Sequence, residues 1–247
     1  RNGGTYSLGT IFSIGIDGSD FTILHEFSGP TTDGGISAGS NLLLSGSTFY
    51  GMTYIGGTAD AGTLFSMDVN GGNFTILHSF TGSGTGGASP VGSLVLSNDK
   101  LYGMTPYDNT SGDDGLIFEF DLSDNELSWT RLFDGTGGSN PQGSLILDGE
   151  TLYGMASAGG TGSYGTIFSI KTDGSDYSVI HNFTGPDGAV PRGDLLMLNG
   201  TLYGMTEGGG AYGGGVIFSS YVPPDPPGDV PEPSTLLLLL PLIGFGL

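Results

Sequence analysis

The stretch Leu-Tyr-Gly-Met-Thr at residues 101–105 decides the fold, because its central triplet Tyr-Gly-Met occurs four times in the chain. The other copies begin at Tyr50, Tyr153 and Tyr203, so the triplet returns every 50–52 residues. Repetition at a fixed period is the sequence signature of repeat architectures. We therefore expect one structural unit, repeated along the chain.

Three further motifs keep the same period. A Gly-(Thr/Leu/Val)-(Ile/Leu)-Phe motif follows the triplet, a segment that ends in Phe comes next, and an apolar run precedes the triplet. These motifs lie at Gly9, Gly62, Gly115, Gly165 and Gly215, at Phe27, Phe80, Phe133 and Phe183, and at Leu42–Leu44, Leu94–Leu96, Leu145–Leu147 and Leu195–Leu198. Four motifs that stay in step over four cycles define the unit.

Each unit predicts four short strands, which we call A, B, C and D. One example of each is Ser93–Leu96, Leu101–Thr105, Gly62–Met67 and Phe74–Phe80. Gly, Asn and Asp, which are typical of hairpin turns, separate A from B and C from D. Strand D alternates between apolar and polar residues, whereas strand A is a continuous apolar run that predicts burial on both faces.

A four-stranded unit of about fifty residues fits the blade of a β-propeller. We predict an all-β, propeller-like array of four-stranded blades over residues 1–220, and a stacked β-solenoid ranks second. The first unit supplies only strands C and D (Gly9–Phe27), and Gly3–Leu8 has the character of a B–C loop without its strand B. We therefore expect truncation at the N-terminus.

The composition restricts the partners. The chain has 247 residues, with 5 Lys and Arg against 25 Asp and Glu, and a net charge of -20. Nucleic-acid binding needs a basic surface, so a nucleic-acid partner is not expected. There is no cysteine, which excludes disulfides and thiolate chemistry.

The repeat resembles the GloVer-type tandem repeat of bacterial exported proteins over roughly residues 1–220. The resemblance rests on Leu-Tyr-Gly-Met-Thr, on Gly-Thr-Ile-Phe-Ser-Ile and on Phe-Thr-Ile-Leu-His-Ser-Phe, although this chain has Met where the family usually has Thr. The resemblance implies a propeller-like exported protein and brings no enzyme activity.

The C-terminal segment has a different composition. Residues 221–233 are rich in proline, which predicts an extended linker. Residues 230–247 are similar to a PEP-CTERM sorting signal, in which the motif is Val230, Pro231, Glu232 and Pro233 and a short apolar helix follows. The resemblance implies sorting by an exosortase-type enzyme and localisation at the cell surface, outer envelope or extracellular matrix. The signal's usual basic end is missing, and membrane contact is expected only through this segment.

Tyrosines in the B–C loops are the candidate binding residues. In a propeller these loops gather at one end, where aromatic rings suit stacking on sugars. The residues are Tyr6, Tyr54, Tyr107, Tyr164 and Tyr212. The alternative is that each ring packs on its own blade.

A calcium site has only weak candidates, which are Asp108, Asp113 and Asp114 in one B–C loop. A solvated loop is the favoured interpretation, so no cofactor is expected. No catalytic residue is predicted either. The equivalent histidines His25, His78 and His181 fall in different blades, and Arg131 takes the same position in another.

These observations favour a non-catalytic exported scaffold that binds partners, with extracellular polysaccharide as one candidate. Two alternatives remain open. One is a propeller-fold polysaccharide lyase or glycosidase, and a glycosidase would need two close carboxylates in a cleft. The other is a purely structural surface spacer.

Overall fold

The computed structural model describes residues 3–29, 32–35, 41–108 and 114–222. Over these ranges the chain is all-β, apart from one turn of 3-10 helix at Gly84–Gly86. Of the predicted linker, Tyr221 ends a strand and Val222 is described. Residues 223–233, the sorting motif at residues 230–233 and the apolar helix predicted after it lie outside the described residues. In the described ranges no helix is long and apolar enough to cross a membrane.

The strands form five antiparallel sheets, numbered here from the N-terminus. Sheet 1 has two strands, β1 (Thr10–Ser13) and β2 (Thr22–Glu26). Sheet 2 contains β3 (Leu43–Ser45), β4 (Thr48–Thr53), β5 (Thr63–Asp68) and β6 (Thr75–Ser79).

Sheet 3 contains β7 (Val95–Ser97), β8 (Lys100–Thr105), β9 (Leu116–Asp121) and β10 (Glu126–Leu132). Sheet 4 contains β11 (Ile146–Asp148), β12 (Thr151–Ala156), β13 (Thr166–Lys171) and β14 (Ser178–Asn182). Sheet 5 contains β15 (Leu196–Leu198), β16 (Thr201–Met205) and β17 (Ile217–Tyr221). The predicted four-stranded units are confirmed, with boundaries shifted by one or two residues.

The glycine of the Tyr-Gly-Met triplet has a packing role within each sheet. Gly103 on β8 pairs with Phe118 on β9, and a Cβ built on Gly103 would lie 2.5 Å from the ring atom Cζ of Phe118. Gly51, Gly154 and Gly204 have the same relation to a phenylalanine on their own third strand. The glycine thus leaves room for the aromatic ring that crosses the sheet.

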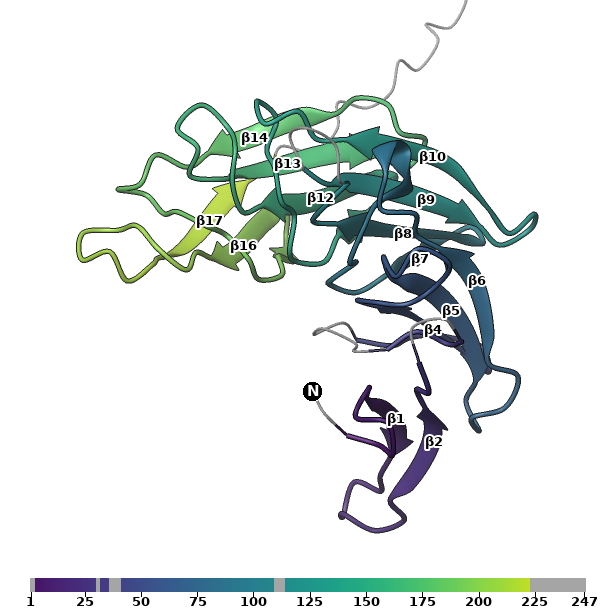
Figure 1. Cartoon of the computed structure of the whole chain (residues 1–247). Coiled ribbons are helices and arrows are strands. Elements are labelled where there is room, and N and C mark those ends of the chain that lie inside the picture. Colours follow the sequence, from purple (N-terminus) through teal and green to yellow (C-terminus); the bar gives the residue numbers. More distant parts are fainter. Residues whose placement is uncertain (1–2, 30–31, 36–40, 109–113, 223–247) are drawn as a thin grey trace, which may run out of the picture.

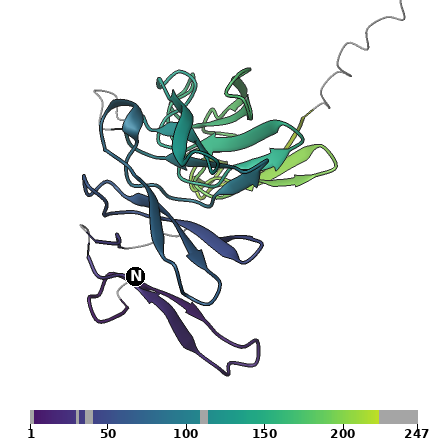
Figure 2. The ribbon, with the colours of Figure 1, turned by 90° about the vertical axis from the view of Figure 1, so that its right-hand side faces the viewer.

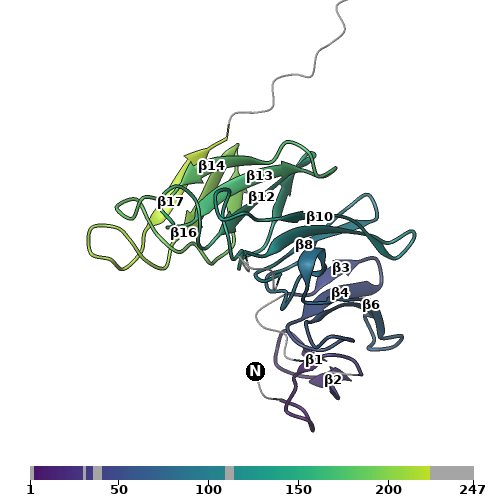
Figure 3. The same cartoon turned by 45° about the horizontal axis from the view of Figure 1, so that its top comes forward.

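The sheets follow one another face to face in an arc (Figure 1). The first strand of each complete sheet lies on the inside of the arc, and the fourth strands β6, β10 and β14 lie on its outside. Figure 2 shows the same succession from the side, from the N-terminal hairpin to the last sheet. Within the part of the chain that the structure describes, the arc is open, and sheets 1 and 5 lie at its two opposite ends (Figures 1 and 3).

Hydrogen bonds join the sheets on the inside of the arc, just before each first strand. The backbone N–H of Asn41 donates to Oγ of Ser93 at 3.1 Å, and that of Ser93 donates to Oγ of Ser144 at 2.8 Å. The N–H of Ser144 donates to Oδ1 of Asp194 at 2.7 Å. These residues occupy equivalent positions, so one hydrogen bond repeats from sheet to sheet.

The apolar core lies between consecutive sheets. The burial of strand A differs from the burial that the sequence predicts. The first strands β3, β7, β11 and β15 are only half-buried or exposed. The second and third strands carry most of the burial instead, and all six residues of β12 are buried. The first leucine of the predicted run is buried in three units, at Leu94, Leu145 and Leu195. The prediction that the rest of strand A is covered on both faces was wrong, because this strand is the sheet edge on the open inner side of the arc.

Candidate binding site

One position breaks the repeat with a buried charge. Glu119 on β9 is 1% exposed, and the four equivalent residues are serines, at Ser13, Ser66, Ser169 and Ser219. A buried carboxylate needs hydrogen-bond donors or a cation to offset its desolvation. Glu119 therefore needs neighbouring donors or a cation that a serine at the equivalent position does not need.

Three donors from the neighbouring strands surround the Glu119 carboxylate. Lys100 Nζ donates to Oε1 at 2.5 Å, and Tyr102 OH donates to Oε2 at 2.9 Å. Trp129 Nε1, on the other side, donates to Oε2 at 3.0 Å. The register of the sheet explains the arrangement, because Tyr102 and Trp129 both pair with Glu119 across the two flanking strands.

The electrostatics keep these donors protonated. The hydrogen bond to Glu119 is the main cause that raises the pKa of the Lys100 ammonium above its ordinary value. Burial is the main cause that raises the pKa of the Tyr102 phenol, and the Glu119 carboxylate adds to it. The Glu119 cluster (Lys100, Tyr102, Glu119 and Trp129) is therefore a fixed set of polar and aromatic groups at neutral pH.

A pocket of about 390 Å³ opens at this cluster between sheets 3 and 4. Its lining includes the whole Glu119 cluster, and the other lining residues are Asn98, Ser128, Thr172 and Asp173. Trp129 Nε1 also lies 3.3 Å from the carbonyl oxygen of Thr172, which ties the cluster to the next sheet. Aromatic surface beside several donors and acceptors is suited to a small, neutral, polyhydroxylated ligand.

The structure spreads the predicted tyrosines over separate loops. Tyr6, Tyr164 and Tyr212 are exposed, with Tyr212 fully in solvent, whereas Tyr54 and Tyr107 are half-buried. Tyr107 packs against the core between sheets 2 and 3. Four of these loops join the second and third strands of their sheet, and the Tyr6 loop precedes β1, which is the equivalent of a third strand. A sugar-binding role for these tyrosines stays a prediction.

The acidic loop is only partly described. Asp108 is buried and Asp114 is half-buried, while Asp113 lies outside the described residues. Over the described ranges, no group of three or more His, Asp or Glu side chains is placed to hold a metal ion. The calcium site stays a prediction.

The equivalent histidines have different surroundings. His25 Nε2 lies 3.1 Å from Asp33 and its ring stacks on Phe74 of sheet 2, at 3.9 Å between centroids. Arg131 uses the same position to place its guanidinium 3.8 Å above the Tyr177 ring of sheet 4. This position therefore serves packing between consecutive sheets.

Sequence reasoning missed the Glu119 cluster, although two signals were present. Glu119 replaces a serine that the other four copies keep, and Trp129 is the single tryptophan of the chain. Departures from a repeat's own consensus mark positions where one unit differs from its neighbours. Only the fold shows that Lys100 and Tyr102 face the same carboxylate.

Comparisons with known proteins agree with this architecture. A family model described as "Gloeobacter/Verrucomicrobia repeat" matches residues 1–149 and 107–223. The chain is similar to a chain in the crystal structure of a nidogen/laminin complex, with a TM-score of 0.55 and 14% identity. That match covers 88% of this chain and 73% of the other, and it shows a β-propeller-like fold alone.

A europium-containing methanol dehydrogenase aligns with a TM-score of 0.49 and 13% identity, over 74% of this chain and 40% of the enzyme. No curated protein matches the chain.

Proposed function

The chain belongs to the Gloeobacter/Verrucomicrobia repeat family, and on that premise we propose that it is a non-catalytic scaffold that binds extracellular polysaccharide. The predicted repeat family is confirmed by this match, whereas binding, export and the absence of catalysis belong to the proposal. The observation that carries the proposal is the pocket at the Glu119 cluster.

The chemistry of the pocket supports a neutral sugar as the ligand. Trp129 and Tyr102 offer aromatic surface, and Glu119, Asn98 and Ser128 line the same pocket with acceptors and donors. Buried polar groups in fixed positions give orientation, while aromatic rings give contact area. The net charge of -20 disfavours a polyanionic glycan.

The hydrogen bonds of the Glu119 carboxylate suit a role in ligand binding better than a role in proton transfer. A carboxylate has about four acceptor positions, and protein donors occupy three of those of Glu119. This supports a binding role over the alternative of a lyase or glycosidase.

The destination proposed for this scaffold is the bacterial surface or extracellular matrix. The basis is the sequence motif Val230, Pro231, Glu232 and Pro233, followed by an apolar run. An exosortase-type enzyme would be the sorting partner. Mass spectrometry of the protein from its cell fraction tests this, because sorting predicts cleavage near Pro233 and an unprocessed chain would contradict it.

Binding is tested on a panel of neutral polysaccharides by glycan array and calorimetry. Two variants restore the repeat's own residues, namely Trp129→Ile, and Lys100→Thr combined with Glu119→Ser. We expect each to weaken binding at least about tenfold, equivalent to about 1.4 kcal/mol, while Tyr212→Ala retains it. Circular dichroism confirms that each variant is folded.

The other outcomes discriminate among the alternatives. Loss of binding in Tyr212→Ala but not in Trp129→Ile would move the site to the loop tyrosines. Release of shortened product from a bound polymer would establish an enzyme. Failure to bind any polysaccharide would contradict the proposal and leave a structural spacer.

A further inference from the structure

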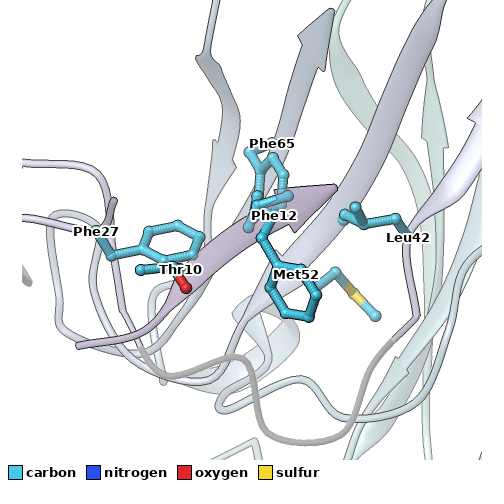
Figure 4. A pocket seen from close by; sticks show the side chains of 8 residues that line it. Thr10, Phe12, Phe27, Leu42, Met52 and Phe65 are labelled. Carbon is cyan, nitrogen blue, oxygen red and sulfur yellow. The ribbon is translucent and has the colours of Figure 1, made fainter. Parts of the chain in front are cut away.

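The turns between strands carry side chains that can react with their own backbone. The pocket between sheets 1 and 2, of about 180 Å³, offers no such chemistry, because the described residues that line it are apolar apart from Thr10 (Figure 4). Several turns, in contrast, place Asn before Gly or Asp. Glycine has no Cβ, so its backbone nitrogen can approach the side-chain amide of a preceding asparagine closely.

Asn199 and Gly200 form the two-residue turn between β15 and β16. Leu198 pairs with Thr201 across this turn, and φ is +50° at Asn199 and +71° at Gly200. Positive φ at both central residues is typical of a type I′ turn, for which Asn-Gly is a preferred pair. Asn199 is exposed, so water reaches its amide group.

The two groups of this turn that would react have no competing hydrogen bond. Within the described ranges, the N–H of Gly200 donates to no acceptor and the side-chain amide of Asn199 has no partner. The turn is held instead through the carbonyl oxygen of Gly200, which accepts a hydrogen bond of 2.8 Å from the N–H of Val222. The nitrogen of Gly200 is therefore available while the turn remains folded.

A second Asn-Gly pair, on the turn between β5 and β6, has its reacting groups occupied. The N–H of Gly71 donates to the carbonyl oxygen of Asp68 at 2.9 Å. Oδ1 of Asn70 accepts a hydrogen bond of 2.9 Å from the N–H of Gly72, which forms an Asx turn. The fold therefore protects Asn70, because attack by the Gly71 nitrogen would break its hydrogen bond to Asp68.

The turn between β7 and β8 has the geometry of the Asn199 turn without its glycine. Here φ is +50° at Asn98 and +59° at Asp99. The carbonyl oxygen of Asp99 accepts a hydrogen bond of 3.0 Å from Leu122, as that of Gly200 does from Val222. A side chain on the residue that supplies the nitrogen obstructs its approach to the amide, so Asn98 is a matched comparison for Asn199.

We propose that Asn199 is a site of spontaneous deamidation in the folded protein, through a succinimide that it forms with Gly200. The nitrogen of Gly200 loses its proton to solvent and bonds to Cγ of Asn199, and the side-chain nitrogen leaves as ammonia. Water then opens the ring. Opening at Cγ gives aspartate, and opening at the backbone carbonyl of residue 199 gives isoaspartate. One water is consumed and one ammonia is released, with no oxidation or reduction.

The isoaspartate product would disturb the hairpin. It adds one carbon atom to the main chain of a turn that has only two central residues, and such a turn depends on its backbone geometry. The pairing of Leu198 with Thr201 closes this turn directly. Formation of isoaspartate is therefore expected to loosen the end of the hairpin formed by β15 and β16.

Peptide mapping by mass spectrometry of the 247-residue chain tests the proposal, after incubation in mildly alkaline buffer with and without guanidinium chloride. Trypsin cleaves after Arg192, and Asn199 is the one asparagine in the sequence beyond that residue. Fragmentation locates the mass gain at Asn70, Asn98 and Asn199 in the same digest. Labelling with an isoaspartyl methyltransferase distinguishes isoaspartate from aspartate.

In the folded protein, Asn199 is expected to deamidate at least about tenfold faster than Asn70, which corresponds to the cost of one broken hydrogen bond. In guanidinium chloride both pairs are unfolded, so they are expected to react at similar rates. Gly200→Asp restores the pair found at Asn98 and is expected to slow the reaction of Asn199 at least about tenfold. Circular dichroism confirms that this variant is folded.

Three results would overturn the proposal. The first is an Asn199 that stays intact in the folded protein. The second is an Asn70 that reacts as fast as Asn199 without denaturant, which would mean that the hydrogen bonds of its turn give no protection. The third is an unchanged rate in Gly200→Asp, which would exclude attack by the nitrogen of residue 200.

Discussion

Gly143 faces the backbone of Gly193 so closely that a Cβ built on Gly143 would lie 2.1 Å from the carbonyl oxygen of Gly193. Gly92 has the same relation to Gly143, at 2.3 Å. These contacts lie one residue before the hydrogen bonds that Ser93 and Ser144 donate to the next sheet. Backbone contact and hydrogen bond together fix the spacing of the sheets on the inside of the arc.

Gly143→Ala is expected to lower the free energy of unfolding by about 2–3 kcal/mol, because the new methyl group can be accommodated only if two backbones separate. Gly193→Ala is the matched control. Gly193 occupies the equivalent position in the last sheet, and a Cβ there would meet no atom within 4 Å. Urea denaturation of both variants checks the difference, and equal loss in the two would contradict it.

Glu119→Ser is expected to lower the free energy of unfolding by about 2 kcal/mol, because Tyr102 and Trp129 lose a charged acceptor. In the Glu119→Ser variant, adding Lys100→Thr is expected to lower the free energy of unfolding by less than Lys100→Thr does in the wild type. The reason is that the lysine has already lost its carboxylate partner. Thermal unfolding of the two single variants and the double variant measures this coupling. Strict additivity would show that Lys100 and Glu119 do not interact.

His78 predicts a loss of stability in mild acid. Burial lowers the pKa of this imidazole below its ordinary value of 6.5, and the buried Nε2 has no hydrogen-bond partner. The unfolded chain therefore takes up the proton first, so the free energy of unfolding decreases as the pH falls below 6.5. In His78→Leu this pH-dependent contribution to the free energy of unfolding disappears. Denaturation of both proteins at pH 7.5 and pH 5 measures it, because the stability difference between the wild type and the variant should change between the two pH values. A constant difference between the two proteins would contradict it.

Arg131→Met is expected to lower the free energy of unfolding by about 1 kcal/mol, through loss of the cation–π contact with the Tyr177 ring. Arg131→His restores the residue found at the equivalent His25, which stacks on Phe74 in the same way. It should therefore recover part of the loss. Chemical denaturation distinguishes the two variants, and equal stability of all three proteins would show that the contact contributes nothing.

The sequence predicted the sheet well because the relevant signals are local. The Tyr-Gly-Met triplet, the Gly-x-x-Phe motif and the turns lie within one unit, and β4, β8, β12 and β16 begin within two residues of it. The burial of strand A was predicted wrongly, since an apolar run does not reveal whether a second surface covers it.

The Glu119 cluster could not be predicted for a related reason. Glu119 and Trp129 are ten residues apart, and Lys100 and Tyr102 precede them on another strand. Their convergence depends on strand register and on a bulge, because the pairing of β9 and β10 shifts between Leu127 and Trp129. Composition and motif spacing carry no record of that shift.

The contact between Gly103 and Phe118 has a consequence for how such chains change over generations. The two partners lie within one unit, as the equivalent partners do in the other sheets. Duplication of a 50–52-residue segment of the coding sequence therefore adds a sheet that already contains its own glycine and its own ring. A unit added in this way needs no substitution elsewhere in the chain to complete the contact between its glycine and its ring.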